Sequence, residues 1–258
     1  MKKITCSKTL SVRIDGKGRF YLPDDLTLRN KKILSIIPVL EMYTWENDFE
    51  EQIVPNDAKN LYINITSDGQ TYFYENMSLY QISSDVVRGL YHQFNQIISF
   101  SNSYILSTTD NVAGDLILVV FYEDEAYNNA TRNIDSNYSY CEIPLLYQNG
   151  LRNPLPDNRI LANKRFRNFI VSFPEQTPQG YEGVEQAEIY DFAYITLCEG
   201  SRIIIDKLPI KLLLQLGEYK MLQFDNIEFD FENSYIQIVG NNHTIENKYL
   251  YMIFEYER

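Results

Sequence analysis

The stretch Leu22-Pro23-Asp24, with Leu28 and Asn30-Lys31-Lys32 after it, occurs a second time in the chain. The second copy reads Leu155-Pro156-Asp157, then Leu161 and Asn163-Lys164-Arg165. From Leu22 to Leu155 the offset is 133 positions, about half of the 258 residues. Three further pairs of segments match in the same order at nearly the same offset: 62–63 with 194–195, 100–105 with 231–236, and 117–121 with 250–254. Collinear matches predict two tandem copies of one domain, residues 1–128 and 129–258.

The patterns within each copy are those of β-strands. Leu10, Val12 and Ile14 alternate with polar residues, as expected for a half-buried strand, and the apolar run 33–40 indicates a covered strand. Turns containing Gly69 and Gly200 separate the arms of two hairpins. We also expect strands over 97–107 and 227–239, and a short helix over 86–94. Seven or eight strands per copy predict an all-β chain of two tandem, duplicated β-sandwich domains, jelly-roll-like or immunoglobulin-like.

The repeated Leu-Pro-Asp motif is itself explained best by a structural role. Proline ends a strand, aspartate starts a turn, and the asparagine that follows can adopt the left-handed conformation. We therefore expect the motif to set a turn and the register of the next strand, and we do not expect it to form an active site.

The composition of the chain bears on targeting segments, disulfides and cofactors. The residues after Met1 are too polar for a signal peptide, and no apolar run is long enough for a transmembrane segment. The three cysteines, Cys6, Cys141 and Cys198, are expected to be buried, reduced thiols. No motif implies a cofactor.

Charge is distributed unevenly along the chain. The formal net charge is −12, yet residues 1–32 hold nine Lys or Arg against three Asp. A mostly acidic surface argues against specific nucleic-acid recognition. The basic segment is either a strand edge protected by lysines or a contact for an acidic neighbouring subunit. Its interface candidates are Lys2, Lys3, Lys8 and Arg13, and we expect removal of residues 1–9 to weaken assembly more than folding.

The sequence contains no recognisable catalytic constellation. The two histidines, His92 and His243, have no cysteine or second histidine at zinc-ligand spacing. The acids Asp225, Glu228, Asp230 and Glu232 alternate with apolar residues, which indicates the exposed face of a strand. Nothing selects a carboxylate pair for glycoside hydrolysis, and no phosphate loop or nucleophile elbow is present. We expect the protein not to be an enzyme, and to bind no metal.

In architecture the whole chain resembles the small double jelly-roll major capsid proteins of tailless, lipid-containing bacteriophages. That resemblance implies two jelly rolls side by side in one chain, self-association into a homotrimer, contacts with other virion proteins, and location in the virion after synthesis in the host cytoplasm. A decoration or connector-ring subunit is a related possibility. The matched long connections 41–58 and 175–188 add Trp45, Phe49 and Tyr181 as interface candidates.

A second interpretation belongs to a different class of protein. Exposed aromatic side chains such as Trp45 could stack on sugars. The alternative function is therefore a tandem carbohydrate-binding β-sandwich protein without catalysis.

Overall fold

A computed structural model describes residues 3–40, 53–87, 92–93, 95–125, 136–145, 152–155, 161, 164–172, 192–215, 227–239 and 248–257. The chain forms two compact units. The N-terminal unit is Ser7–Asp124, and the C-terminal unit comprises Glu125–Arg258 together with Met1–Cys6. The division thus falls at 124/125, where the sequence suggested 128/129, and the first six residues belong to the C-terminal unit.

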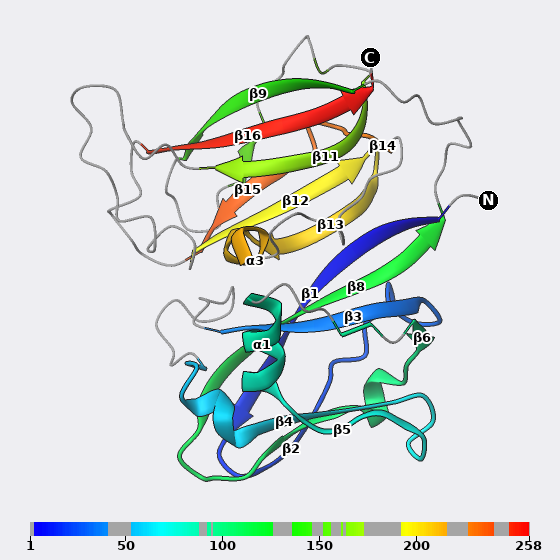
Figure 1. Ribbon diagram of the computed structural model, residues 1–258, viewed down its shortest axis with the longest axis vertical. Helices are drawn as coiled ribbons and strands as arrows, with labels where there is room; N and C mark the ends of the chain where they lie inside the picture. Colours follow the sequence, from blue (N-terminus) through cyan, green and yellow to red (C-terminus); the bar gives the residue numbers. More distant parts are fainter. Residues whose placement is uncertain are drawn as a thin grey trace. The chain divides into compact units, whose positions relative to one another are not determined.

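In the described part of the N-terminal unit, strands are joined by two 3-10 turns and one helix, and Figure 1 shows their arrangement. Strands β1, β8, β3 and β6 are neighbours in this order in one sheet, and β2, β7, β4 and β5 in another. The elements are β1 Lys3–Asp15, β2 Gly18–Tyr21, β3 Lys32–Val39, η1 Asp57–Asn60, β4 Leu61–Thr66, β5 Tyr72–Ser78, α1 Leu79–Val87, β6 Gln96–Ile97, η2 Phe100–Asn102, β7 Tyr104–Ser107 and β8 Ala113–Glu125.

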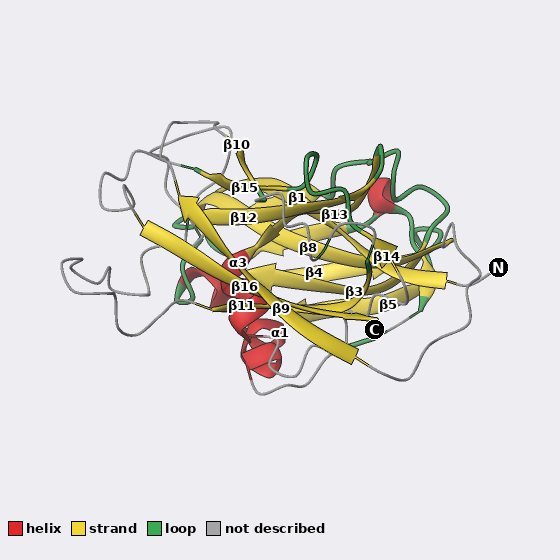
Figure 2. Ribbon diagram, turned by 90° about the horizontal axis from the view of Figure 1, so that it is seen from above, coloured by secondary structure: helices red, strands yellow, loops and turns green. Residues whose placement is uncertain are grey.

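The C-terminal unit has the same strand order. Its sheets run β9-β16-β11-β14 and β10-β15-β12-β13, which is the N-terminal order with eight added to every number. The elements are β9 Ser136–Leu145, β10 Arg152–Pro154, β11 Arg165–Ser172, β12 Ala193–Glu199, β13 Arg202–Pro209, α3 Ile210–Gln215, β14 Ile227–Glu228, β15 Tyr235–Ile238 and β16 Lys248–Glu257. This order is that of a jelly roll, so the all-β sandwich prediction is confirmed and strands dominate the fold (Figure 2).

Strand pairing also corresponds between the units. Tyr62 in β4 pairs with Ser78 and Leu106, and Tyr194 in β12 pairs with Pro209 and Gln237. Irregularities in register follow at matching places, between 63 and 66 in β4 and between 195 and 198 in β12. Left-handed backbone occurs at the corresponding residues Asn76 (φ 49°) and Lys207 (φ 50°). The two units therefore share local distortions as well as topology.

The last strand corrects one of the sequence matches. Phe121 of β8 pairs with Ser35, whereas Glu255 of β16 pairs with Asn168 at the corresponding point of its sheet. The offset in this strand is therefore 134, from 121 to 255, and the predicted match of 117–121 with 250–254 is wrong by one residue. Both runs are mainly apolar, so composition could not reveal a slip that exchanges the two faces of a strand.

The cores differ in side-chain type. In the N-terminal unit, aliphatic residues such as Ile14, Ile36 and Val119 are almost fully buried. In the C-terminal unit, aromatic rings pack around Phe254, whose ring centroid lies 5.3 Å from that of Phe166 and 5.7 Å from that of Phe231. Aromatic pairs at these separations contribute about 0.5–1.5 kcal/mol beyond the burial of their area.

The helix expected over 86–94 begins earlier in the structure. Helix α1 covers Leu79–Val87, and residues 88–91 and 94 of the expected span lie outside the described residues. Its first turn is capped by Ser78, whose hydroxyl accepts a hydrogen bond from the N–H of Gln81 at 3.3 Å. Ser78 and Gln81 have the spacing of a capping box, which is the signal that locates this helix.

Two of the predicted strands were too long. The segment 97–107 contains β6, the turn η2 and β7, and the segment 227–239 contains β14, a turn and β15. Asp230 lies in that second turn, where its Oδ1 accepts hydrogen bonds from the N–H groups of Glu232 (3.0 Å) and Asn233 (3.1 Å). The alternating acids of this segment are therefore not one exposed strand face, because local hydrogen bonds to Asp230 close a turn there.

Candidate assembly surface

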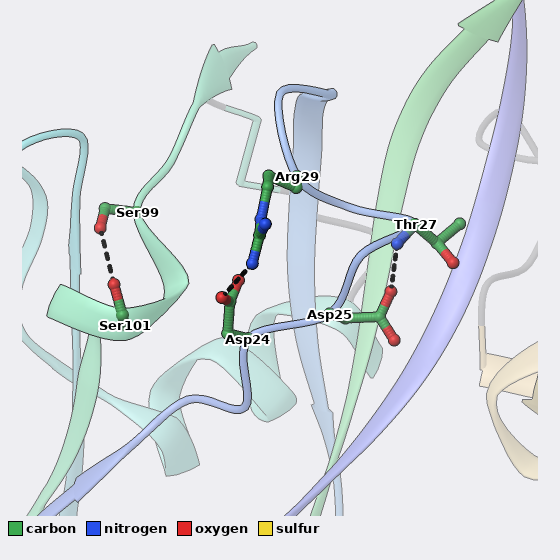
Figure 3. Close-up of polar contacts among 6 residues, drawn as sticks. All are labelled: Asp24, Asp25, Thr27, Arg29, Ser99 and Ser101. Atoms are coloured by element: carbon green, nitrogen blue, oxygen red, sulfur yellow. Dashed lines mark hydrogen bonds and ion pairs between the residues drawn. The ribbon is translucent and has the colours of Figure 1, made fainter.

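The Leu-Pro-Asp motif forms the turn that the sequence indicated (Figure 3). Asp24 Oδ2 accepts a hydrogen bond from Arg29 Nη2 at 2.6 Å, and Asp25 Oδ1 accepts one from the N–H of Thr27 at 2.8 Å. Leu28 is buried and Asn30 has left-handed backbone, with φ of 64°. The structural role of the motif is thus confirmed for the first copy.

The described part of the second copy shows the same anchoring. The N–H of Leu22 donates to the carbonyl of Ser103 at 2.9 Å, and that of Leu155 donates to the carbonyl of Ser234 at 3.0 Å. Leu161, like Leu28, is almost fully buried. In each unit the leucine that begins the motif follows a strand, β2 or β10, and its N–H binds the serine that precedes the next strand of that sheet, β7 or β15.

Several predicted interface residues lie outside the described residues. They are Lys2, Trp45, Phe49 and Tyr181, together with the connection 175–188 and most of 41–58. Lys3 begins β1.

Lys8 and Arg13 are partnered within their own unit. Lys8 Nζ lies 3.6 Å from Asp25 Oδ2, and Arg13 Nη1 lies 3.4 Å from Asp115 Oδ2. Further along the basic segment, Lys31 Nζ lies 2.5 Å from Asp124 Oδ1. Carboxylates from the beginning and the end of the Ser7–Asp124 sequence thus neutralise part of the positive charge of residues 1–32.

The start of β1 is part of a core. Ile4 and Cys6 are 3% and 0% exposed. Removal of residues 1–9 therefore deletes buried side chains, and we now expect it to impair folding directly. The expectation that this deletion acts mainly on assembly is revised for that reason.

A cluster that the sequence analysis missed lies on β2 and β7. The guanidinium carbon of Arg19 is 4.9 Å from the ring centroid of Tyr104, and the ring of Tyr21 meets that of Tyr104 edge-on with centroids 5.8 Å apart. Tyr21 pairs directly with Tyr104 across the strands and is 56% exposed. Burial raises the pKa of Tyr104, while the nearby Arg19 opposes that rise. We call Arg19, Tyr21 and Tyr104 the Arg19 cluster.

The C-terminal unit repeats the central contact. The guanidinium carbon of Arg152 lies 4.5 Å from the ring centroid of Tyr235, on the corresponding strands β10 and β15. A signal was present in the sequence, because Arg19 and Arg152 each stand three residues before a Leu-Pro-Asp motif. An exposed arginine held against a tyrosine ring is a preorganised group for binding a partner.

The remaining chemical candidates have structural partners. His92 Nε2 lies 2.9 Å from Asp85 Oδ2, while His243 is outside the described residues. The three cysteines are buried thiols outside any disulfide, as expected. Within the described ranges, no group of three or more side chains could hold a metal ion, and no helix is long and apolar enough to cross a membrane.

Comparison with known proteins yields one weak likeness. No family model matches the chain, and no curated protein is similar enough to count as a relative. A solved structure similar to it is the major capsid protein P2 from bacteriophage PM2. The two are 8% identical over 97% of this chain and 96% of that one, with a TM-score of 0.23. A likeness at this level carries no argument about function, so any argument must come from the chain itself.

Proposed function

We propose that this chain is a virion structural protein, a double jelly-roll capsid subunit that assembles through the sides of its sandwiches. The observation that carries the proposal is the recurrence of one jelly-roll order, with one pairing register, in two consecutive units. Two units of the same design in one chain present similar surfaces twice, so fewer chains are needed to build a symmetric lattice.

The proposed assembly is a homotrimer. Three chains about a three-fold axis would place six similar units around one centre, and six-fold arrangements tile a plane. A closed cyclic arrangement is the usual solution for repeated subunit contacts. A contact that holds a shell together typically buries more than about 2,000 Å² and is rich in aromatic residues. The Arg19 cluster supplies an exposed arginine and the exposed ring of Tyr21, and the C-terminal unit supplies an exposed arginine, Arg152, held over the ring of Tyr235.

The proposed setting is the virion, after synthesis in the host cytoplasm, with other virion proteins as further partners. The net charge of −12 supports protein contacts over recognition of nucleic-acid phosphates. We further propose that the chain has no catalytic activity.

The test is the state of the purified full-length chain. Size-exclusion chromatography with light scattering should give a trimer mass, and electron microscopy at high concentration should show pseudo-hexagonal particles or sheets. A chain that remains monomeric at every accessible concentration contradicts the proposal.

The Arg19 cluster also supports the second candidate, a carbohydrate-binding protein without catalysis. An exposed tyrosine beside an arginine is a suitable platform for a sugar ring and its hydroxyls. Glycan-array binding by a monomeric chain, lost on Tyr21→Ala, would favour this candidate over the capsid subunit.

A further inference from the structure

Strand β9 is the last strand of its sheet among the described residues, and it is ten residues long. Its ten residues, Ser136–Leu145, pair along their whole length with β16, from Ser136–Glu257 at one end to Leu145–Lys248 at the other. Among the described strands, β16 is its only neighbour, and β9 ends the order β14-β11-β16-β9 (Figure 1). Open edges of this kind present unpaired backbone groups to any strand that can reach them.

The sequence of β9 has few of the devices that protect open edges, since Glu142 is its one charged residue and Pro144 its one proline. It contains no Lys or Arg, and tyrosines, Cys141 and Ile143 give it a strong preference for sheet. Pro144, near its end, is the one residue without a backbone donor. Tyr138, by contrast, leaves a large ring 65% exposed on this strand. With a single proline and no lysine, most of β9 remains able to pair with a further strand.

The strand that corresponds to β9 does have two neighbours. In the strand order β1 stands between β13 and β8. The first residues of β1, up to Cys6, belong to the same C-terminal unit as β13 and extend its sheet beyond that strand. The edge of β13 therefore pairs with β1, and by correspondence the edge of β5 could pair with β9.

The complementary edge is β5, which corresponds to β13. β5 ends the order β2-β7-β4-β5 and has β4 as its neighbour among the described strands. Its left-handed residue Asn76 corresponds to Lys207 of β13, and β13 accepts β1 despite that distortion. Among the described strands, β9 and β5 thus each end a sheet, while their counterparts β1 and β13 are neighbours.

We propose that β9 of one chain pairs with β5 of a second copy of this chain, and so repeats between chains the relation of β1 to β13. The inference rests on the proposed capsid function and names its subunit contact. Because the two edges differ, the contact is head-to-tail, and it closes into a ring only when the rotation between copies allows it. Backbone hydrogen bonds would provide affinity, as in other cases of strand addition.

The test uses cysteines on the two edges of the full-length chain. Tyr138→Cys and Glu75→Cys introduce accessible thiols on β9 and β5, while the three natural thiols are buried. A short bis-maleimide should link chains of the double variant into covalent dimers and trimers. Each single variant should stay uncrosslinked, and the natural chain is the background control.

A disruptive variant gives a second readout. Tyr138→Lys places a charge on the edge and should weaken self-association by about tenfold or more. Leu26→Lys makes the same kind of change at a loop residue that is 77% exposed, and should leave self-association unchanged.

The outcomes separate the two proposals. Crosslinking by Tyr138→Cys alone means that two β9 strands meet symmetrically, and this overturns the pairing with β5. A stable trimer that neither crosslinks nor responds to Tyr138→Lys also overturns the edge contact, while the capsid function stands. A monomer by light scattering overturns the capsid function itself.

Discussion

The backbone N–H of Thr66 donates a hydrogen bond to the hydroxyl of Ser103 at 3.1 Å, and both residues are completely buried. The same hydroxyl donates to the carbonyl of Ser99 at 2.7 Å. In the C-terminal unit, the N–H of Cys198 donates to the hydroxyl of Ser234 at 3.0 Å. The serine of the repeated Asn-Ser-Tyr-Ile segment thus accepts a hydrogen bond from a buried backbone N–H near the end of β4 in one unit and of β12 in the other. This requirement explains why that segment recurs in both halves.

Replacement of this serine should destabilise the chain. Ser103→Ala leaves the buried N–H of Thr66 without its acceptor, which should lower the free energy of unfolding by about 1–3 kcal/mol. Ser234→Ala should have a similar effect through Cys198. Urea unfolding followed by tryptophan and tyrosine fluorescence measures both. Ser101→Ala, at an exposed neighbour, is the control and should change little.

The turn after the first Leu-Pro-Asp motif should depend on the backbone at Asn30. Asn30 is exposed and has φ of 64°, a conformation that costs an ordinary side chain about 1–2 kcal/mol. Asn30→Val should therefore lower the free energy of unfolding by about that amount, whereas Asn30→Gly should be close to neutral. Equal destabilisation by valine and glycine would show that the asparagine side chain, and not the backbone conformation, matters here.

The hairpin turn at Asp68 should make stability depend on pH in the acid range. Backbone N–H groups of Thr71 (2.7 Å) and Gln70 (2.8 Å) donate to Asp68 Oδ1, and these hydrogen bonds lower the pKa of this carboxyl. Because the folded-state pKa lies below the unfolded value of about 3.9, the stabilisation is complete above that value and is lost as pH falls through the folded pKa.

Two variants test this dependence. Relative to Asp68→Asn, which keeps an acceptor but does not titrate, the natural chain should lose stability as the pH falls through that range. NMR titration of the Asp68 carboxyl should give a pKa below about 3.9. A titration at or above that value contradicts the prediction.

Self-association should be sensitive to the two repeated arginines. Arg19→Ala and Arg152→Ala each remove a cation–π contact worth about 0.5–1 kcal/mol at an exposed site, so folding should survive. If these arginines face a neighbouring subunit, the double variant should shift the equilibrium towards monomer in light scattering. Lys17→Ala, an exposed cation on the turn beside β2, is the matched control. If the double variant remains a trimer, the two arginines do not contribute to the contact between subunits, and the prediction is wrong.

Much of the fold could be predicted because its signals are local. Alternation at Leu10, Val12 and Ile14 and the glycines at 69 and 200 located strands and hairpins correctly. Errors arose where two local signals competed. Ser78 and Ser84 are both plausible helix caps, and the structure uses Ser78.

Other features could not be predicted because they depend on residues far apart in the sequence. The carboxylate that pairs with Arg13 is Asp115, about a hundred residues away. Lys207 adopts a left-handed conformation that lysine does not favour, so the surrounding sheet imposes it. The candidate surface was missed for the same reason, since Arg19 and Tyr104 meet only when β2 pairs with β7.

The assignment of Met1–Cys6 to the C-terminal unit has a consequence for biosynthesis. Residues 1–6 are synthesised before the N-terminal unit, yet they belong to the unit that is completed after it. The N-terminal unit, Ser7–Asp124, can acquire its structure while residues 125–258 are still being translated. The C-terminal unit cannot form until β16 has been made, although residues 1–6 are synthesised much earlier. Nascent chains released near residue 125 should therefore carry one finished unit preceded by residues 1–6, in which Ile4 and Cys6 have not yet been buried in the core of the C-terminal unit.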